Sequence, residues 1–206
     1  MRNRGIWWRA AVTAGWLACA TALPAQSALP APPWTFRSSL FLTGGSDHST
    51  PIGYQVYSAI GLAVGLDRQV ARRLVAALTV RPESREVDLT TPQGVRQREG
   101  SVDLVVTDLT LRYQPGRGSR GGPYAGAGVS LMVAWEKSGT LDTLDIAPHV
   151  GLALEAGVDV PLSDLILFNV ELGWNGEQVS LDSGGEQLAE IDIDPLVLSV
   201  GLGFRF

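Results

Sequence analysis

Cysteine, lysine and long apolar runs are all scarce in this chain of 206 residues. A single cysteine excludes a disulfide scaffold, and no internal apolar run reaches the roughly 18 residues typical of a membrane-spanning helix. The 16 basic and 21 acidic residues give a net charge of −5, which argues against a nucleic-acid partner. Lys137 is the only lysine, whereas a soluble domain normally spreads many lysines over its surface. The exterior is therefore expected to be unusual.

The N-terminus has the layout of a secretory signal peptide. A basic segment with three arginines is followed by an apolar stretch, Ala10–Ala22, and then by small residues around Ala25. Cleavage after this segment would remove Cys19 and the three arginines, and would take the net charge from −5 to −8. A lipoprotein signal at Cys19 is the alternative, but Trp16 stands where such signals hold a compact aliphatic residue. We therefore assign residues 1–27 to a signal peptide.

The rest of the chain is dominated by apolar residues that alternate with small or polar ones. The final run is the clearest, and its apolar row consists of Leu196, Leu198, Val200, Leu202, Phe204 and Phe206. A period of two is typical of β-strands, and no window shows convincing helical spacing. The predicted strands are residues 34–43, 54–66, 73–86, 102–114, 123–135, 146–161, 164–177 and 190–206.

The residues opposite the apolar rows decide which face points outward. They are rich in glycine and alanine with a few scattered charges, which would be a poor surface for a soluble sandwich or a lipocalin-like barrel. Small residues suit the lumen of an eight-stranded barrel, which is only wide enough for side chains to fill. The apolar rows would then face lipid. The predicted fold is all-β, an eight-stranded antiparallel up-and-down transmembrane β-barrel over residues 34–206.

The connections alternate in length, as they do in outer-membrane barrels. The short ones are residues 67–72, 115–122 and 161–163, and the longer, polar ones are 44–53, 87–101, 136–145 and 178–189. Short turns are typical of the periplasmic end and longer loops of the extracellular end. Aromatic residues fall near both expected interfaces, at Trp34, Phe36, Tyr113, Phe206, Trp135 and Trp174. The predicted location is the cell outer membrane, with its lipids as partners.

Three segments resemble the OmpW family of small outer-membrane proteins. Ile191–Phe206 has an Asp-Pro, alternating apolar residues and an aromatic-Arg-Phe ending, as the family's last strand does. Pro123–Val129 is similar to the family's Pro-Tyr-x-Gly-x-Gly strand opening, and Trp34-x-x-Arg37 to its first strand. Leu196 departs from the pattern, because the family usually has tryptophan there, and OmpA-like barrels are the broader class. The resemblance implies passive uptake of small hydrophobic molecules without a cofactor, and the terminal Phe206 implies recognition by the barrel-assembly machinery.

Charged residues on the inward rows predict an ionic plug. Counting from the short turns places Arg81, Asp108, Glu155 and Glu171 near mid-height, and Arg37, Arg112, Asp159 and Arg205 nearer the periplasm. Uncompensated charge is costly inside a narrow barrel, so these groups are expected to interlock as hydrogen-bonded ion pairs. The plug would block bulk water, whether it only fills the barrel or also gates it.

Above the plug the inward row becomes apolar. The residues expected to line an upper chamber and to bind small hydrophobic solutes are Phe41, Tyr57, Leu104, Val106, Met132 and His149. Ordinary packing of the lumen is the competing explanation. Pro82 lies within the third predicted strand, where its missing N–H removes a ladder bond. In the resembled family a lateral opening is associated with a proline in this strand, so Pro82 marks either a lateral exit or only the point where the strand leaves the membrane.

Two other functions compete with transport. A lipid-modifying enzyme would need an ordered nucleophile, base and acid, and neither His48 nor His149 stands in such an arrangement. Asp47 with His48, or Asp142 and Asp145 with His149, do not have a recognised metal-ligand spacing. No enzyme activity, cofactor or metal site is therefore predicted. A structural or adhesive barrel without transport is the main alternative, because the longer loops are polar and contain glycine.

Overall fold

The computed structural model describes residues 34–48, 53–90, 96–115, 121–139, 145–183, 186–193 and 196–206. Regular structure in this part of the chain is almost entirely β-strand. None of its segments is a helix with the length and apolar character needed to cross a bilayer. The predicted signal peptide at residues 1–27 lies outside the described residues.

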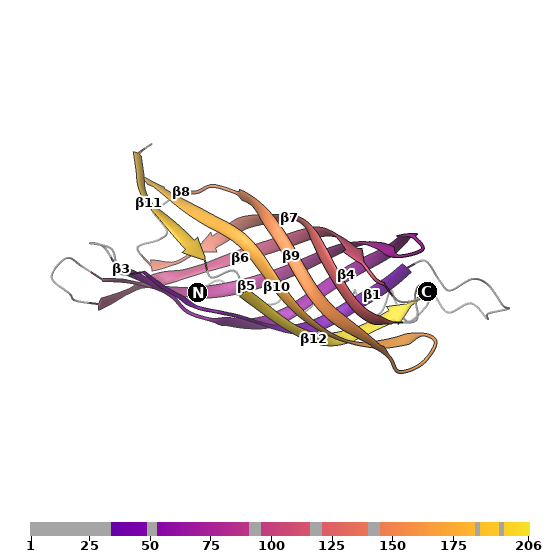
Figure 1. Cartoon of the computed structure of the whole chain (residues 1–206). Helices are drawn as coiled ribbons and strands as arrows, with labels where there is room; N and C mark the ends of the chain where they lie inside the picture. Colours follow the sequence, from indigo (N-terminus) through magenta and orange to yellow (C-terminus); the bar gives the residue numbers. More distant parts are fainter. Residues whose placement is uncertain are drawn as a thin grey trace.

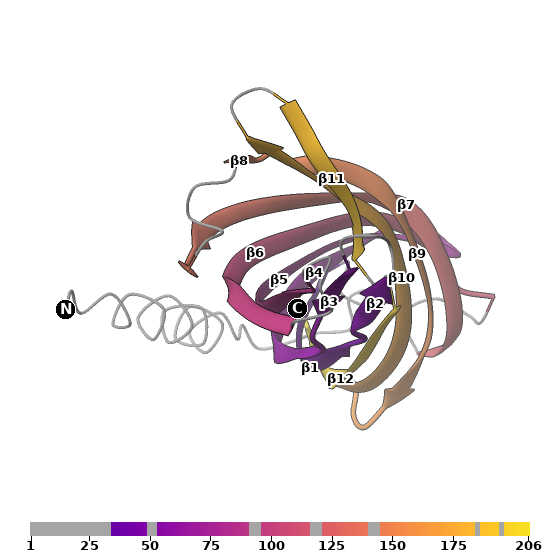
Figure 2. The same ribbon diagram turned by 90° about the vertical axis from the view of Figure 1, so that its left-hand side faces the viewer.

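Eight long antiparallel strands form a closed barrel (Figures 1 and 2). They are β1 (Trp34–Thr43), β4 (Ala59–Ala71), β5 (Leu74–Thr90), β6 (Arg96–Tyr113), β7 (Gly122–Lys137), β9 (His149–Pro161), β10 (Ile166–Ser183) and β12 (Leu196–Arg205). Each pairs with the next, and β1 closes on β12 with Phe36 opposite Phe204 and Leu42 opposite Leu198. Closure removes the free strand edges that lipid could not hydrate. The predicted eight-stranded barrel is confirmed.

Four short strands extend the wall at the end with the longer connections. They are β2 (Ser46–His48), β3 (Gly53–Val56), β8 (Asp145–Ile146) and β11 (Glu186–Ile193). Strand β3 pairs with β5, whereas β8 and β11 pair with the far end of β10. The prediction of plain loops at 44–53 and 178–189 is therefore wrong. Strands outside the bilayer need no lipid-facing apolar row, so their sequence does not have to carry the alternation that marks the membrane strands.

The wall is also longer than expected at the periplasmic end. Residues 67–72 were predicted as a turn, but β4 continues to Ala71 and only residues 72 and 73 form the turn. Asp67 is thereby an inward-facing residue of β4, 3% exposed, and belongs to the lumen.

The apolar rows face outward, as predicted. In β12 the outward side chains of Leu198 and Leu202 are 46% and 40% exposed, whereas Val197 on the opposite, inward row is only 4% exposed. In β4 the outward Ile60 contrasts in the same way with the buried Ala63. Exposed leucines and valines surround the whole barrel, which is the surface that lipid requires and water does not tolerate.

One part of the wall lacks a continuous ladder. It lies between β4 and β5, whose facing residues are all described. The β4–β5 ladder ends at the Val64–Val80 pair. Strand β5 is next paired on this edge at Val87, opposite Val56 of β3. Pro82 lies between these two points and has no N–H to donate. We call this interval, residues 81–86 of β5, the ladder break.

Replacement of Val200 by arginine tests the outward orientation. Val200 lies on β12 midway between the Trp174–Leu196 pair and the Ile166–Phe204 pair, hence near mid-membrane. Val200→Arg should lower the free energy of unfolding in lipid vesicles by about 2–4 kcal/mol, because a guanidinium would enter hydrocarbon. The control Val70→Arg, next to the periplasmic turn, should cost only about 0–1 kcal/mol. Guanidinium titration followed by tryptophan fluorescence measures both, and equal costs would contradict the assignment.

Candidate functional site in the barrel lumen

Strand β6 shows how polarity is sorted along the lumen. Its buried inward row runs from three apolar residues, Val102, Leu104 and Val106, to three polar ones, Asp108, Thr110 and Arg112, and Gln114 continues it just beyond the strand. The polar residues lie next to the β6–β7 turn at the periplasmic end, and the apolar ones lie toward the longer loops. The inward row of β6 is therefore apolar toward the longer loops and polar toward the periplasm. The neighbouring row of β5 differs, because Arg81, Glu83 and Arg85 pair with Val106, Leu104 and Val102.

The lower part holds a group of interlocked charges that we call the periplasmic ion cluster. Its members are Arg37, Asp67, Arg112, Glu155, Asp159 and Glu171. Arg37 donates from Nε to Asp67 Oδ2 at 2.5 Å. Its two terminal nitrogens donate to the two oxygens of Asp159 at 2.7 and 2.8 Å. This two-pronged contact uses the planar fork of arginine, which lysine cannot reproduce.

Arg112 is the centre of the cluster and is 1% exposed. It donates from Nε and Nη2 to the two oxygens of Glu155 at 2.6 and 2.8 Å. The same Nη2 also reaches Glu171 at 2.9 Å, and Nη1 reaches Asp67 Oδ2 at 3.2 Å. One guanidinium from β6 thus links β4, β9 and β10 across the lumen.

Two arginines face four carboxylates in this cluster, so neutral side chains supply the remaining hydrogen bonds to the carboxylate oxygens. The Tyr124 hydroxyl donates to Glu171 at 2.6 Å, and the Thr110 hydroxyl donates to Glu155 at 2.6 Å. Asn169 and Gln114 donate to Asp159 at 2.9 and 3.1 Å. The Tyr124 ring also lies under the Arg112 guanidinium, with 4.9 Å between the Arg112 Cζ and the ring centroid.

Two glycines of the inward rows make room for the cluster. A Cβ at Gly126 would lie 2.5 Å from Glu155 Oε1, and a Cβ at Gly157 would lie 2.5 Å from the Tyr124 hydroxyl. The glycine-rich rows therefore leave space for large ionic side chains from the neighbouring strands, because the eight-stranded lumen has room for few of them.

A central ion cluster lies above the first. Arg81 contacts Asp108 and Glu83, and Arg85 donates from Nε to Glu83 Oε2 at 2.9 Å. Asp108 also accepts from Asn175 at 2.8 Å. Of the four residues predicted near mid-height, Arg81 and Asp108 are thus brought together here, whereas Glu155 and Glu171 meet at Arg112 below.

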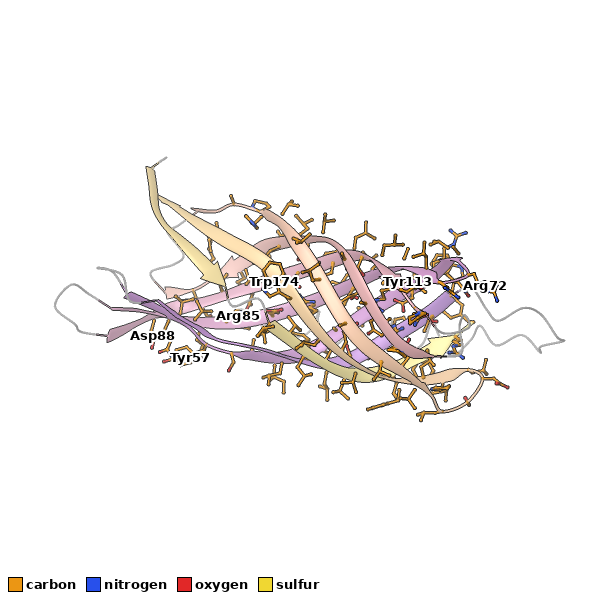
Figure 3. The ribbon with its side chains drawn as sticks, in the orientation of Figure 1. Tyr57, Arg72, Arg85, Asp88, Tyr113 and Trp174 are labelled. Atoms are coloured by element: carbon orange, nitrogen blue, oxygen red, sulfur yellow. The ribbon has the colours of Figure 1, made fainter. Side chains whose placement is uncertain are left out.

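Polar contacts from this level reach across the ladder break. Arg85 donates from Nη1 to the backbone oxygen of Gly44, at the end of β1, at 3.1 Å. The backbone N–H of Tyr57 donates to Glu86 O at 3.1 Å, and the Tyr57 hydroxyl donates to Asp88 at 2.8 Å. Tyr57, Arg85 and Asp88 lie together toward the long-loop end in Figure 3. Side chains here supply contacts in a region where the β4–β5 ladder is interrupted.

The upper lumen contains an apolar cluster. Its buried members are Val56, Val87, Val102, Leu104, Val106 and Met132. Three residues predicted to line a chamber, Leu104, Val106 and Met132, meet in it. Phe41 lies in a second cluster with Ala63 and Val197.

The other two residues predicted for the chamber lie outside these clusters. Tyr57 is 38% exposed at the rim, and His149 is half-buried at the start of β9. The binding of a solute by these side chains stays a prediction.

The periplasmic mouth holds a cavity of about 30 Å³ below the ion cluster. Its lining includes Arg37, Asp67, Asp159 and Arg205. This volume accommodates about two water molecules. In the part of the chain that is described, no group of three or more His, Cys, Asp or Glu side chains is placed to hold a metal ion.

Several residues of the site were not anticipated from the sequence. Asp67 falls in a predicted turn, and Glu83 and Arg85 fall in the third predicted strand without a role in the predicted ion plug. Tyr124 was noted only as part of a motif. All four could have been found from the two-residue period of a strand, because each lies on the inward row with a small or charged residue two positions away.

Removal of the Arg112 guanidinium tests the importance of the periplasmic ion cluster. Arg112→Met should lower the free energy of unfolding by about 3–5 kcal/mol, because Glu155, Glu171 and Asp67 lose a common buried partner. Arg112→Lys keeps the charge without the fork and should lose less. Denaturant unfolding in vesicles measures both variants. A methionine variant as stable as the wild type would show that the carboxylates do not depend on Arg112.

Comparison with known proteins agrees with this geometry. The sequence profile of the OmpW family matches residues 50–206. No curated protein matches the chain.

Among solved structures, OprG of Pseudomonas aeruginosa superposes with a TM-score of 0.71 at 20% identity, covering 85% of this chain and 96% of OprG. AlkL in lipid bilayers gives 0.61 at 22% identity, covering 89% and 95%. OmpW of E. coli gives 0.61 at 18% identity, covering 85% and 98%. These likenesses support the barrel fold.

The family match extends over most of the chain and includes seven of the eight barrel strands. Together with the lipid-facing rows it places the protein in the cell outer membrane. The chain belongs to the OmpW family of outer-membrane β-barrel proteins.

Proposed function

We propose that this barrel takes up small hydrophobic molecules passively from the cell exterior. The observation that carries the proposal is the sorting of the β6 inward row, in which Val102, Leu104 and Val106 precede Asp108 and Arg112. An apolar solute entering from the loop end would meet side chains of its own polarity on β6 and at Met132, beside the charged row of β5. Its further descent would require it to displace buried ion pairs, which is costly.

The ladder break offers such a solute a way out. It adjoins the apolar part of the lumen, because Val87 of the apolar cluster is the residue at which β5 resumes pairing on this edge. The β4–β5 ladder has no register pairs beyond Val64–Val80, and the bond from Tyr57 N–H to Glu86 O lies at the far end of the ladder break, so separating the wall here costs less than breaking an intact ladder. The solute would therefore pass sideways into the hydrocarbon of the membrane beside Pro82, past Glu83 and Arg85 of the central ion cluster but without crossing the periplasmic ion cluster.

Uptake of an apolar fluorescent dye by intact Gram-negative cells tests the transport itself. Expression of the protein should speed dye entry but leave entry of a polar sugar unchanged. Met132→Gln preserves the side-chain volume and places an amide in the apolar cluster. It should slow dye entry by about fivefold or more, because an amide buried without a partner costs about 1 kcal/mol or more. Dye entry equal to that of cells without the protein would favour a structural barrel.

Exchange of Pro82 separates the lateral route from the uptake itself. Pro82→Ala restores an N–H at the ladder break and should bring dye entry toward the rate of cells without the protein. The matched control is Pro123→Ala on β7, which makes the same chemical change near the periplasmic end and should leave the rate unaltered. If Pro82→Ala transports as well as the wild type, the exit lies elsewhere even though uptake stands.

A further inference from the structure

The outer surface of the β4–β5 hairpin carries three exposed arginines, Arg68, Arg72 and Arg73. Arg68 stands on the lipid-facing row of β4, directly after Leu62, Val64 and Leu66. Arg72 and Arg73 form the turn that follows. A guanidinium on a lipid-facing row is tolerated only where the hydrocarbon ends, at the depth of the headgroups. The hairpin therefore marks the periplasmic surface of the membrane.

Aromatic rings frame these arginines. The Arg68 Cζ lies 5.0 Å from the centroid of the Trp34 ring, and Trp34 is its register partner on β1. Arg73 donates from Nη1 to the Tyr113 hydroxyl at a long 3.4 Å. Tyr113 is 46% exposed and ends the lipid-facing row of β6. Figure 3 shows Arg72 and Tyr113 at the same end of the barrel. Tryptophan and tyrosine are the residues that settle at the headgroup level.

These arginines contrast with those of the lumen. Arg37, Arg81, Arg85 and Arg112 all contact carboxylates. Within the described residues, the contacts of Arg68, Arg72 and Arg73 include no carboxylate. Among the described residues, three guanidinium groups therefore present positive charge without a carboxylate partner on one side of the barrel rim.

We propose that Arg68, Arg72 and Arg73, with Trp34 and Tyr113, form a binding site for the phosphate of an anionic phospholipid in the periplasmic leaflet. Arginine matches the phosphate oxygens with two parallel N–H donors. The acyl chains of the same lipid would lie against Leu66, Leu78 and Leu111, which are exposed on the adjoining strands. This continuity with an apolar wall favours a lipid phosphate over free phosphate, because free phosphate would gain nothing from those leucines.

The test uses the protein purified from outer membranes in mild detergent and exposed to equal amounts of phosphatidylglycerol and phosphatidylcholine. The ratio of the two lipids retained, read by native mass spectrometry, should favour phosphatidylglycerol, whose phosphate is not neutralised by an attached cation. Arg68→Gln should lower that ratio about fivefold, and the triple change Arg68→Gln, Arg72→Gln, Arg73→Gln should abolish the preference. The corresponding lysine variants should keep part of it.

Lys137→Gln is the control, since it removes a charge at the opposite end of the barrel and should leave the ratio unaltered. Reduced electrophoretic mobility on heating verifies that each variant is folded. A wild type that retains both lipids equally, or a triple variant that keeps the preference, would overturn the proposal. It would also be overturned if inorganic phosphate alone bound at the hairpin and displaced the lipid, because the ligand would then be the free anion.

Discussion

The contacts between buried guanidinium groups and carboxylates across the lumen constrain the rest of this barrel. Arg112 alone joins β6 to β4, β9 and β10, and Arg37 joins β1 to β4 and β9. Burying so many charges is costly unless every oxygen has a donor, which explains the hydroxyl and amide groups around the cluster. It also explains why glycines rather than larger residues stand at positions 126 and 157.

These contacts fill the lumen at the level of the periplasmic ion cluster. The apolar cluster lies above that level, beside the arginines and Glu83 of β5, and the ladder break adjoins it. In the proposed function the two features support each other, because a vestibule closed below would need an exit at its own level. Arg85 and Tyr57 contribute polar contacts near the proposed exit, so the strength of these contacts would set how readily the wall separates.

The fold was predictable because a strand in a membrane barrel needs apolar side chains on the row that faces lipid and small or polar ones on the row that faces the lumen. The orientation of each strand is therefore visible in its sequence. The alternation in β12 gave the strand, its outward face and, with the small residues opposite, the barrel. The ion-pair partners were not predictable. The two-residue period of the strands places Asp67, Glu155 and Arg112 in the lumen, but it does not reveal the shear between strands that brings them to one height. The outer strands were predicted less well: β2 lies in a predicted loop, and the predicted strands 54–66 and 190–206 join β3 to β4 and part of β11 to β12. Outside the bilayer neither face of a strand meets lipid, so neither is required to be apolar.

The register of strand β4 places one charged residue on each face of the wall. Asp67 points inward to Arg37 and Arg112, and the next residue, Arg68, points outward to the Trp34 ring. A slip of one residue would place the carboxylate in lipid and the guanidinium among other guanidinium groups, so both charges oppose the same error. The adjacent pair therefore fixes the height of β4 in the membrane as well as its pairing with β1. Arg68, a charged residue on a lipid-facing row, therefore helps to hold the barrel in register and at its depth in the membrane.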